Sequence, residues 1–282
     1  MSSRALRRGA HALLVVALLC TSCLDSCSKD PSLDPLPEDE TRPYDSGPPA
    51  MSPGTLRALG PHIWDASLDI RGDKAGLWPS REVVSKLVWA DIDRSLFEEI
   101  SGGRLQREIR VGEDAYRAGA HDMLYRKNRE PGGNTIIQLR TLSLWDQALG
   151  GFARQLGWRR IGADTVDGRP VTVWKIELAP PPALDTATPL SPDVAAKRLG
   201  LATKPIRLAG TVYVDDATGN RLLAELEGRF VAREVVGGRD PTDEVMVTYR
   251  ERRSLSAVPP TVEAPPPEQI FVRRTRLPTG GR

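Results

Sequence analysis

Strict alternation of apolar and polar residues is the feature of this sequence that most limits its fold. Trp64, Ala66, Leu68 and Ile70 lie on one side of an extended chain, with polar residues between them. Alternation of this kind predicts a β-strand with one buried and one exposed face. The same period recurs near residues 83–89, 105–111, 172–178, 212–214, 222–226 and 245–249.

Short turn sequences separate these runs. Gly102-Gly103 and Asp167-Gly168 each lie between two runs, and residues 215–220 and 237–241 join two further pairs. Asp-Gly is typical of a two-residue hairpin turn, and strands joined by such turns are antiparallel. We therefore expect a mainly β fold with few helices, in which about eight to eleven strands form a curved antiparallel sheet.

One helix is expected in segment 137–156. Leu142, Trp145, Leu149 and Phe152 recur there at steps of three or four, which is the spacing of one apolar helix face. Glycines at 150 and 151 weaken the middle of the segment and allow it to split into two helices. We expect this helix to cover the sheet.

Two shorter helical segments are also expected. Ser191 can cap a helix that begins with Pro192 and ends before Gly200. Residues 56–59 add one turn before the first strand. Of these helical segments, one or two are expected to cover the sheet.

The first residues have the pattern of an export signal. Arg4, Arg7 and Arg8 precede an apolar run at 12–19, which is shorter than the about 20 residues of a membrane-spanning helix. Cys23 follows Thr-Ser directly after this run. The arrangement resembles the lipobox of bacterial lipoproteins, in which the cysteine becomes the lipid-bearing first residue.

The resemblance implies a signal peptide at 1–22 and lipidation of Cys23. Cys20 follows the large Leu19, and Cys27 has the charged Asp25 at a position where the motif prefers an uncharged residue. Both nevertheless remain alternatives for the lipidated cysteine, as does plain secretion with removal of the peptide.

Proline marks both flanks of the expected domain. Residues 23–54 combine the lipid anchor with a linker rich in proline and acidic residues, and residues 259–282 form a Pro-rich, basic tail. Such segments bury little and stay extended. The β-domain is therefore expected at 55–258, a length that supports a single core.

The charge balance does not favour nucleic acid as a partner. The formal charge is +2, but removal of Arg4, Arg7 and Arg8 leaves 36 basic and 37 acidic residues. The two signs are interspersed along the sequence, so no field of one sign is expected. No cysteine follows Cys27, which excludes disulfides and thiolate metal sites from the domain.

No catalytic set and no metal site is expected. His62 and His121 are the only histidines after the leader, and each is interpreted as a surface or strand-end residue. Asp215 and Asp216 lack the spaced ligands of a calcium loop and are interpreted as a hairpin turn. No cofactor is expected either, and the chain is expected not to be an enzyme.

The apolar strand face is the candidate binding surface. A large sheet with little helix to cover it can curl around an apolar ligand or simply fill its core. The candidate ligand-binding residues are Trp64, Leu68, Ile70, Leu87, Trp89, Trp174, Ile176, Leu178, Val212 and Val214. The candidate lid residues are Leu142, Trp145, Leu149 and Phe152.

These features together resemble the LolA/LolB superfamily of periplasmic lipoprotein carriers and receptors. The likeness is carried by the lipobox, the antiparallel strands, the sparse helices and the hairpin at 210–224. It implies an open half-barrel that takes acyl chains in its concavity. A LolB-like protein exposes an apolar loop residue; Leu77-Trp78 is a candidate, although a Trp buried in the core is the favoured interpretation.

We therefore expect an exported protein, lipid-anchored to a bacterial membrane on its periplasmic side, with the outer membrane as the expected location. A lipid, an acyl chain or a lipoprotein is the expected ligand. The alternative is an interaction module with a filled core, which binds a protein of the cell envelope.

Overall fold

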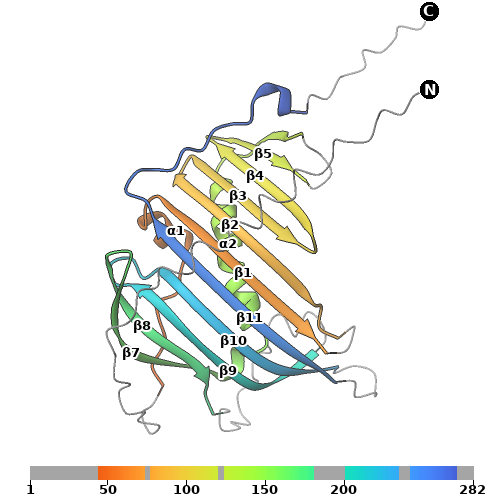
Figure 1. Cartoon of the computed structure of the whole chain (residues 1–282), viewed down its shortest axis with the longest axis vertical. Helices are drawn as coiled ribbons and strands as arrows, with labels where there is room; N and C mark the ends of the chain where they lie inside the picture. Colours follow the sequence, from red (N-terminus) through yellow and green to blue (C-terminus); the bar gives the residue numbers. More distant parts are fainter. Residues whose placement is uncertain (1–43, 74–76, 120–123, 181–200, 235–241, 272–282) are drawn as a thin grey trace, which may run out of the picture. The chain divides into compact units, whose positions relative to one another are not determined.

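The computed structural model describes residues 44–73, 77–119, 124–180, 201–234 and 242–271 (Figure 1). The chain divides into a unit of residues 1–42 and a unit of residues 43–282, and every described residue belongs to the second unit. The expected lipidation site, the helix expected from Ser191, the turn expected at 237–241 and His121 all lie outside the described residues.

The described chain forms one open, eleven-stranded antiparallel sheet, as the alternation predicted. The strands follow one another across the sheet in the order β6-β5-β4-β3-β2-β1-β11-β10-β9-β8-β7. Their bounds are β1 His62–Gly72, β2 Arg81–Asp91, β3 Arg94–Ser101, β4 Arg104–Val111, β5 Asp114–Ala118, β6 Arg126–Arg129, β7 Leu156–Val166, β8 Arg169–Leu178, β9 Leu201–Asp215, β10 Arg221–Glu234 and β11 Thr242–Leu255.

The sheet consists of two meanders that meet at its centre. Strands β1 to β6 run from the centre to one edge, and β7 to β11 run from the other edge back to the centre, where β1 pairs with β11. The consecutive strands β6 and β7 therefore lie at opposite edges. Helix α2 (Asn134–Leu149) connects them and crosses one face of the sheet, behind the strands in Figure 1.

The turns predicted at Gly102-Gly103 and Asp167-Gly168 are confirmed. Gly102 and Gly103 have φ values of 56° and 73° in the β3–β4 turn, and Asp167 and Gly168 have values of 49° and 78° in the β7–β8 turn. Two consecutive positive φ angles define the type I′ hairpin turn. The helical turn expected at 56–59 is present as α1 (Pro53–Ala58), capped by Ser52.

Helix α2 differs from the expected helix in its bounds. It starts at Asn134 and ends at Leu149, and Gly150 is its C-cap. A short 3₁₀ helix, η1 (Ala153–Gln155), follows, and Leu156 is the first residue of β7 instead of a helical residue. The glycine pair thus stops the helix, because glycine favours helix ends over helix interiors.

The dry face of β4 is the reverse of the expected one. The alternation suggested that Leu105, Ile109 and Val111 face the core, but Glu108 and Arg110 are buried instead. Glu108 lies opposite Phe97, and Arg110 lies opposite Ser95, in the β3–β4 register. Because Phe97 and Ser95 face α2, the two charged residues face it as well.

The flanking segments near the domain pack against the sheet edges. Asp45 pairs with Trp158 of β7 through a 2.8 Å backbone hydrogen bond. The described part of the tail includes the 3₁₀ helix η2 (Pro267–Gln269), and Ile270 pairs with Tyr125 next to β6. Both edges of the sheet are thus partly covered, which protects exposed strand edges. Within the described ranges, no helix has the length and apolarity to cross a membrane.

Candidate functional site

The sheet face beneath α2 carries a packed hydrophobic core. Trp174 and Leu178 are half-buried, and the other eight predicted ligand-binding residues are buried in one cluster. Among the lid candidates, Trp145, Leu149 and Phe152 join this cluster, whereas Leu142 is half-buried. The structure thus brings the predicted residues together as a filled core.

A hollow remains at the edge of this core. It has a volume of about 240 Å³ and lies between the segment before α1, helix α2 and strand β7. This is less than the roughly 300–1,000 Å³ of typical ligand pockets. Its lining residues are Pro48, Pro49, Ala50, Met51, Leu142, Trp145, Asp146, Trp158 and Arg221.

A β-bulge turns Arg221 towards this hollow. Arg221 pairs with Val214 of β9, but Leu223 pairs with the adjacent Tyr213, so one extra residue of β10 is accommodated between them. Val214 faces the core, and the bulge gives Arg221 the same orientation. The guanidinium then lies 4.4 Å from the centre of the Trp145 ring, a cation–π contact between sheet and helix.

Arg221 belongs to a buried charge cluster at the ends of β10 and β11. Its Nε donates to Glu251 at 2.5 Å, and Arg253 donates to the other oxygen of Glu251 at 2.9 Å. Tyr249 and Trp64 donate to that same oxygen at 2.9 and 3.1 Å. The Glu251 and Arg253 side chains are fully buried.

The cluster keeps Glu251 ionised. Burial alone would raise the pKa of this carboxyl group, but the attraction of Arg221 and Arg253, together with their hydrogen bonds and that of Trp64, lowers it to about 2. One carboxylate thus serves two guanidinium groups. Burial of an incompletely paired charge is costly, so this arrangement requires a reason.

Several N–H donors of the two arginines have no hydrogen-bond partner among the described residues. They are Nη2 of Arg221 and both Nε and Nη2 of Arg253. Arg253 also donates to the Arg221 carbonyl at 2.9 Å, which holds it in place. The exposed Asp146 lines the same hollow and attracts Arg221 electrostatically.

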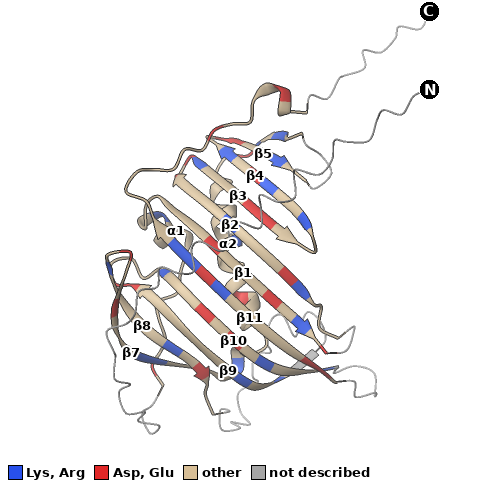
Figure 2. Cartoon of the chain, viewed as in Figure 1, with Lys and Arg blue, Asp and Glu red and all other residues tan. Residues whose placement is uncertain are grey.

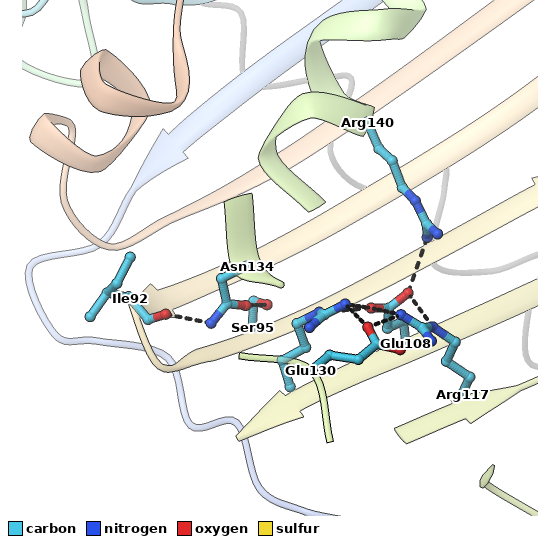
Figure 3. Close-up of polar contacts among 8 residues, drawn as sticks. Ile92, Ser95, Glu108, Arg117, Glu130, Asn134 and Arg140 are labelled. Atoms are coloured by element: carbon cyan, nitrogen blue, oxygen red, sulfur yellow. Dashed lines mark hydrogen bonds and ion pairs between the residues drawn. The ribbon is translucent and has the colours of Figure 1, made fainter. Parts of the chain in front are cut away.

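A second charged cluster lies beneath the start of α2, and hydrogen bonds link its arginines and glutamates (Figure 3). Glu108 accepts hydrogen bonds from Arg110, Arg117 and Arg140 at 2.7–3.2 Å, and Glu130 binds Arg110 and Arg117. These contacts explain how β4 and β5 tolerate charges on their buried face. The cluster joins β4, β5 and α2 and has the character of a structural element.

The opposite face of the sheet carries an open groove of about 520 Å³. Val84, Ile100 and Leu105 lie directly opposite one another across β2, β3 and β4 and form an exposed apolar row at one end of it. Charged residues of both signs line the rest together with alanine, serine and leucine residues. Figure 2 looks onto this face and shows acidic and basic bands interspersed over β11, β1 and β2.

Trp78 lies in the hydrophobic core, as expected. Trp78 is buried, and its ring meets that of Phe230 edge-on at a centroid distance of 4.8 Å. The alternative of an exposed apolar loop residue is therefore wrong for Trp78. Leu77 packs against the same cluster.

His62 begins a strand, as expected, but it is buried and not a surface residue. Burial lowers its pKa to about 4, and the nearby Arg253 adds to this effect despite the opposing hydrogen bond with Gly60. The Asp215 turn is also as expected, since it joins β9 to β10 and the Gly219 N–H donates to the Asp215 carbonyl at 2.8 Å. Arg169 binds the Asp215 carboxylate through two nitrogens at 2.7 and 2.8 Å. Across the described residues, no group of His, Cys, Asp and Glu side chains has the arrangement of a metal site.

Arg221, Glu251 and Arg253 were not predicted from the sequence. A signal for two of them was present: the period of Val245, Val247 and Tyr249 continues directly to Glu251 and Arg253. Charged residues in phase with a buried face indicate a polar site. Arg221 gave no such signal, because the bulge shifts the phase of β10.

Comparisons with known proteins concern architecture alone. No protein-family model and no curated protein matches the chain. Its architecture is similar to a LolA superfamily protein from Nitrosomonas europaea, with 8% identity over 74% of this chain and 96% of that one, at a TM-score of 0.24.

Two mycobacterial structures are similar at the same level. LprF from Mycobacterium bovis has 14% identity over 78% of this chain and 99% of its own, at a TM-score of 0.27. The lipoprotein LppX from Mycobacterium tuberculosis has 12% identity over 75% and 97%, at a TM-score of 0.26. Likenesses this low carry no argument about ligand or role, so the functional case depends on the chain's own residues.

Proposed function

We propose that this protein is a lipoprotein of the bacterial cell envelope that binds the apolar chain of a lipid, without covalent chemistry, between α2 and the sheet. Cys23 carries the anchor, and the protein faces the periplasm from the outer membrane. The predicted strand residues form the wall of the site. Leu142, Trp145 and Leu149 of α2 form its lid, whereas Phe152 lies beyond the end of α2 at Gly150 and stays with the wall. The described structure is then the closed, ligand-free state.

The observation that carries this proposal is the contact between α2 and the sheet. A single 16-residue helix lies against β1, β3 and β11 of the apolar face. Gln138 is buried in that contact, and neither polar atom of its side chain has a partner among the described residues. An unpaired buried polar group costs about 1–3 kcal/mol, so the helix is held less tightly than an apolar contact would hold it.

The hollow beside Trp145 gives the chain of a ligand a starting point. Its walls are mostly apolar, and it adjoins both α2 and the core. Displacement of α2 about the glycines at 150 and 151 would join the hollow to the core face. The affinity would come from apolar burial, at about 25 cal/mol per Å² before ordering costs are subtracted.

The test is lipid uptake by the mature chain, residues 23–282, with Cys23→Ser to omit the anchor. We expect native mass spectrometry to detect a co-purified lipid, or a fluorescent fatty acid to bind with saturation. If the detergent-free protein neither carries a co-purified lipid nor binds the fluorescent fatty acid, the proposal is overturned. The packed core would then favour the alternative, an interaction module of an envelope complex.

A further inference from the structure

We propose that Arg221, backed by Arg253, binds the carboxylate of an amphipathic ligand whose apolar chain lies along Trp145 and Trp158. The inference rests on the proposed function, because it names the headgroup of the ligand that would enter beneath α2. It makes an ionised fatty acid, and not a neutral lipid of the same chain length, the preferred class of ligand.

Arg221 and Arg253 have buried N–H donors without a hydrogen-bond partner in the described part of the chain. A guanidinium presents five N–H donors in a planar fork, and it stays charged when buried. Glu251 accepts from both arginines, which still leaves donors on Arg221 and Arg253 unpaired. Both side chains are more than nine-tenths buried. One further carboxylate beside Arg221 would supply an acceptor for its Nη2 and balance the charge of the second guanidinium.

The location of Arg221 supports the same inference. It lines the hollow together with two indole rings, so a cation and an apolar wall meet in one site. A bulge in β10 is responsible for this placement, and bulges often re-aim a side chain next to a functional site. Amphipathic ligands need this combination of an apolar wall and one fixed charge.

The Trp145 ring currently lies where the ligand carboxylate would bind Arg221. It covers the guanidinium of Arg221, and Nη2 of that residue is inaccessible to water. Movement of Trp145 with α2 would expose the donors as the apolar face opens. The carboxylate would then replace the ring as the partner of Arg221, with charge-assisted hydrogen bonds stronger than the cation–π contact they replace.

Asp146 offers a second position at which the proposed site can be tested by substitution. Its carboxylate lines the hollow on α2 and attracts Arg221, although no hydrogen bond joins the two. It would therefore compete with a ligand carboxylate for the same cation. Because Asp146 is exposed, its replacement leaves the core intact.

The experiment compares laurate with 1-dodecanol, which has the same chain and no charge, by calorimetry on the mature chain at neutral pH. We expect laurate to bind about tenfold or more tightly than dodecanol, the scale of one charge-assisted hydrogen bond. In Arg221→Met the two affinities should become equal through loss of laurate binding alone. In Asp146→Asn laurate binding should tighten, while dodecanol binding stays the same.

The matched control is Arg252→Met. Arg252 is the neighbour of Arg253 on β11, but it faces the opposite side of the sheet and binds Asp167. It should leave both affinities unchanged. The thermal unfolding midpoint of each variant establishes that it is folded, and Asp146→Asn keeps the test decisive if Arg221→Met does not fold.

The outcomes separate the two proposals. Equal binding of laurate and dodecanol to the unmodified chain overturns the headgroup site and leaves lipid binding in place. An equal loss of both ligands in Arg221→Met shows a merely structural role and also overturns it. Binding of neither ligand overturns the proposed function itself, and this inference with it.

Discussion

The guanidinium of Arg221 lies 4.4 Å from the centre of the Trp145 ring, so a residue of β10 and a residue of α2 are joined across the buried face. The ring also meets Tyr249 of β11 edge-on, at a centroid distance of 5.4 Å. Trp145 is thus the side chain through which α2 contacts both the charge cluster and the core.

Truncation of Trp145 should weaken the attachment of α2. Removal of a buried Trp side chain costs about 3–5 kcal/mol, because both apolar contacts and the filling of the core are lost. We expect Trp145→Ala to lower the free energy of unfolding in urea by this amount. Leu139→Ala, on the exposed side of the same helix, should change it by less than about 1 kcal/mol. Similar effects of the two variants would contradict this assignment.

Replacement of Gln138 by Leu should hold α2 more tightly. The substitution removes two unpaired polar atoms from the contact with the sheet and adds an apolar group of similar size. We expect a gain of about 1–2 kcal/mol in the free energy of unfolding and slower uptake of a fluorescent fatty acid. Gln106→Leu makes the same change at an exposed site of β4 and should alter neither property. Faster uptake in Gln138→Leu would show that α2 is not the lid.

His62 should make the protein sensitive to mild acid. Its pKa falls from 6.5 to about 4 on folding, mainly through burial. Between these values the unfolded chain binds a proton that the folded chain does not. The contribution of His62 to the free energy of unfolding is therefore fully present above pH 6.5 and is lost as the pH falls towards 4. The loss amounts to roughly 3 kcal/mol over the whole interval.

The variant that tests this is His62→Asn, which retains a donor and cannot titrate. Its free energy of unfolding should change little over the same interval, although it starts lower. The loss due to Glu251 follows only below its ordinary value of 4.5, because the folded pKa of that group is about 2. An unchanged slope in His62→Asn would assign the acid sensitivity to other groups.

Gly228 is expected to tolerate no side chain. A Cβ atom at this position of β10 would collide with the ring of Phe152, which packs edge-on against Phe230 at a centroid distance of 5.3 Å. We expect Gly228→Ala to lower the free energy of unfolding by about 1–3 kcal/mol, as overpacking does. Gly162→Ala is the control in β7, since a Cβ atom there meets nothing within 4 Å. Urea unfolding of both variants checks the comparison.

Cys23 should be the site of lipid attachment. We expect Cys23→Ala to abolish incorporation of a radiolabelled fatty acid in bacterial cells, because the modified thiol is removed. Cys20→Ala and Cys27→Ala should retain the label, since neither residue follows two small residues next to the apolar run. Loss of the label in either control instead would move the lipid site to that cysteine.

The sheet could be predicted from the sequence because its signals are local. Alternation in Trp64, Leu68 and Ile70 reflects a face that is buried along a whole strand, and the glycine pairs report turns of two residues. The central pairing of β1 with β11 has no such signal. It joins residues far apart in the chain, and a single sequence does not contain that information.

The candidate site was less accessible to sequence reasoning. Trp145 and Leu142 were found through helical spacing, but Arg221, which lines the same hollow and contacts Trp145, was hidden by the bulge in β10. Glu108 and Arg110 show a second difficulty. Charged residues are assigned to the wet face by default, and only the register of β4 with β3 reveals that they pair in the core.

The pairing of β1 with β11 also determines how late in the emergence of the chain this protein can fold. Trp64 and Glu251 are hydrogen-bonded across 187 positions, so the middle of the sheet stays open until the last strand has arrived. Contacts this distant in sequence slow folding, because a large loop must close first. A chain exported through a membrane pore from its N-terminus would thus emerge in the unfolded state. Its sheet would form only after nearly all of the chain has emerged.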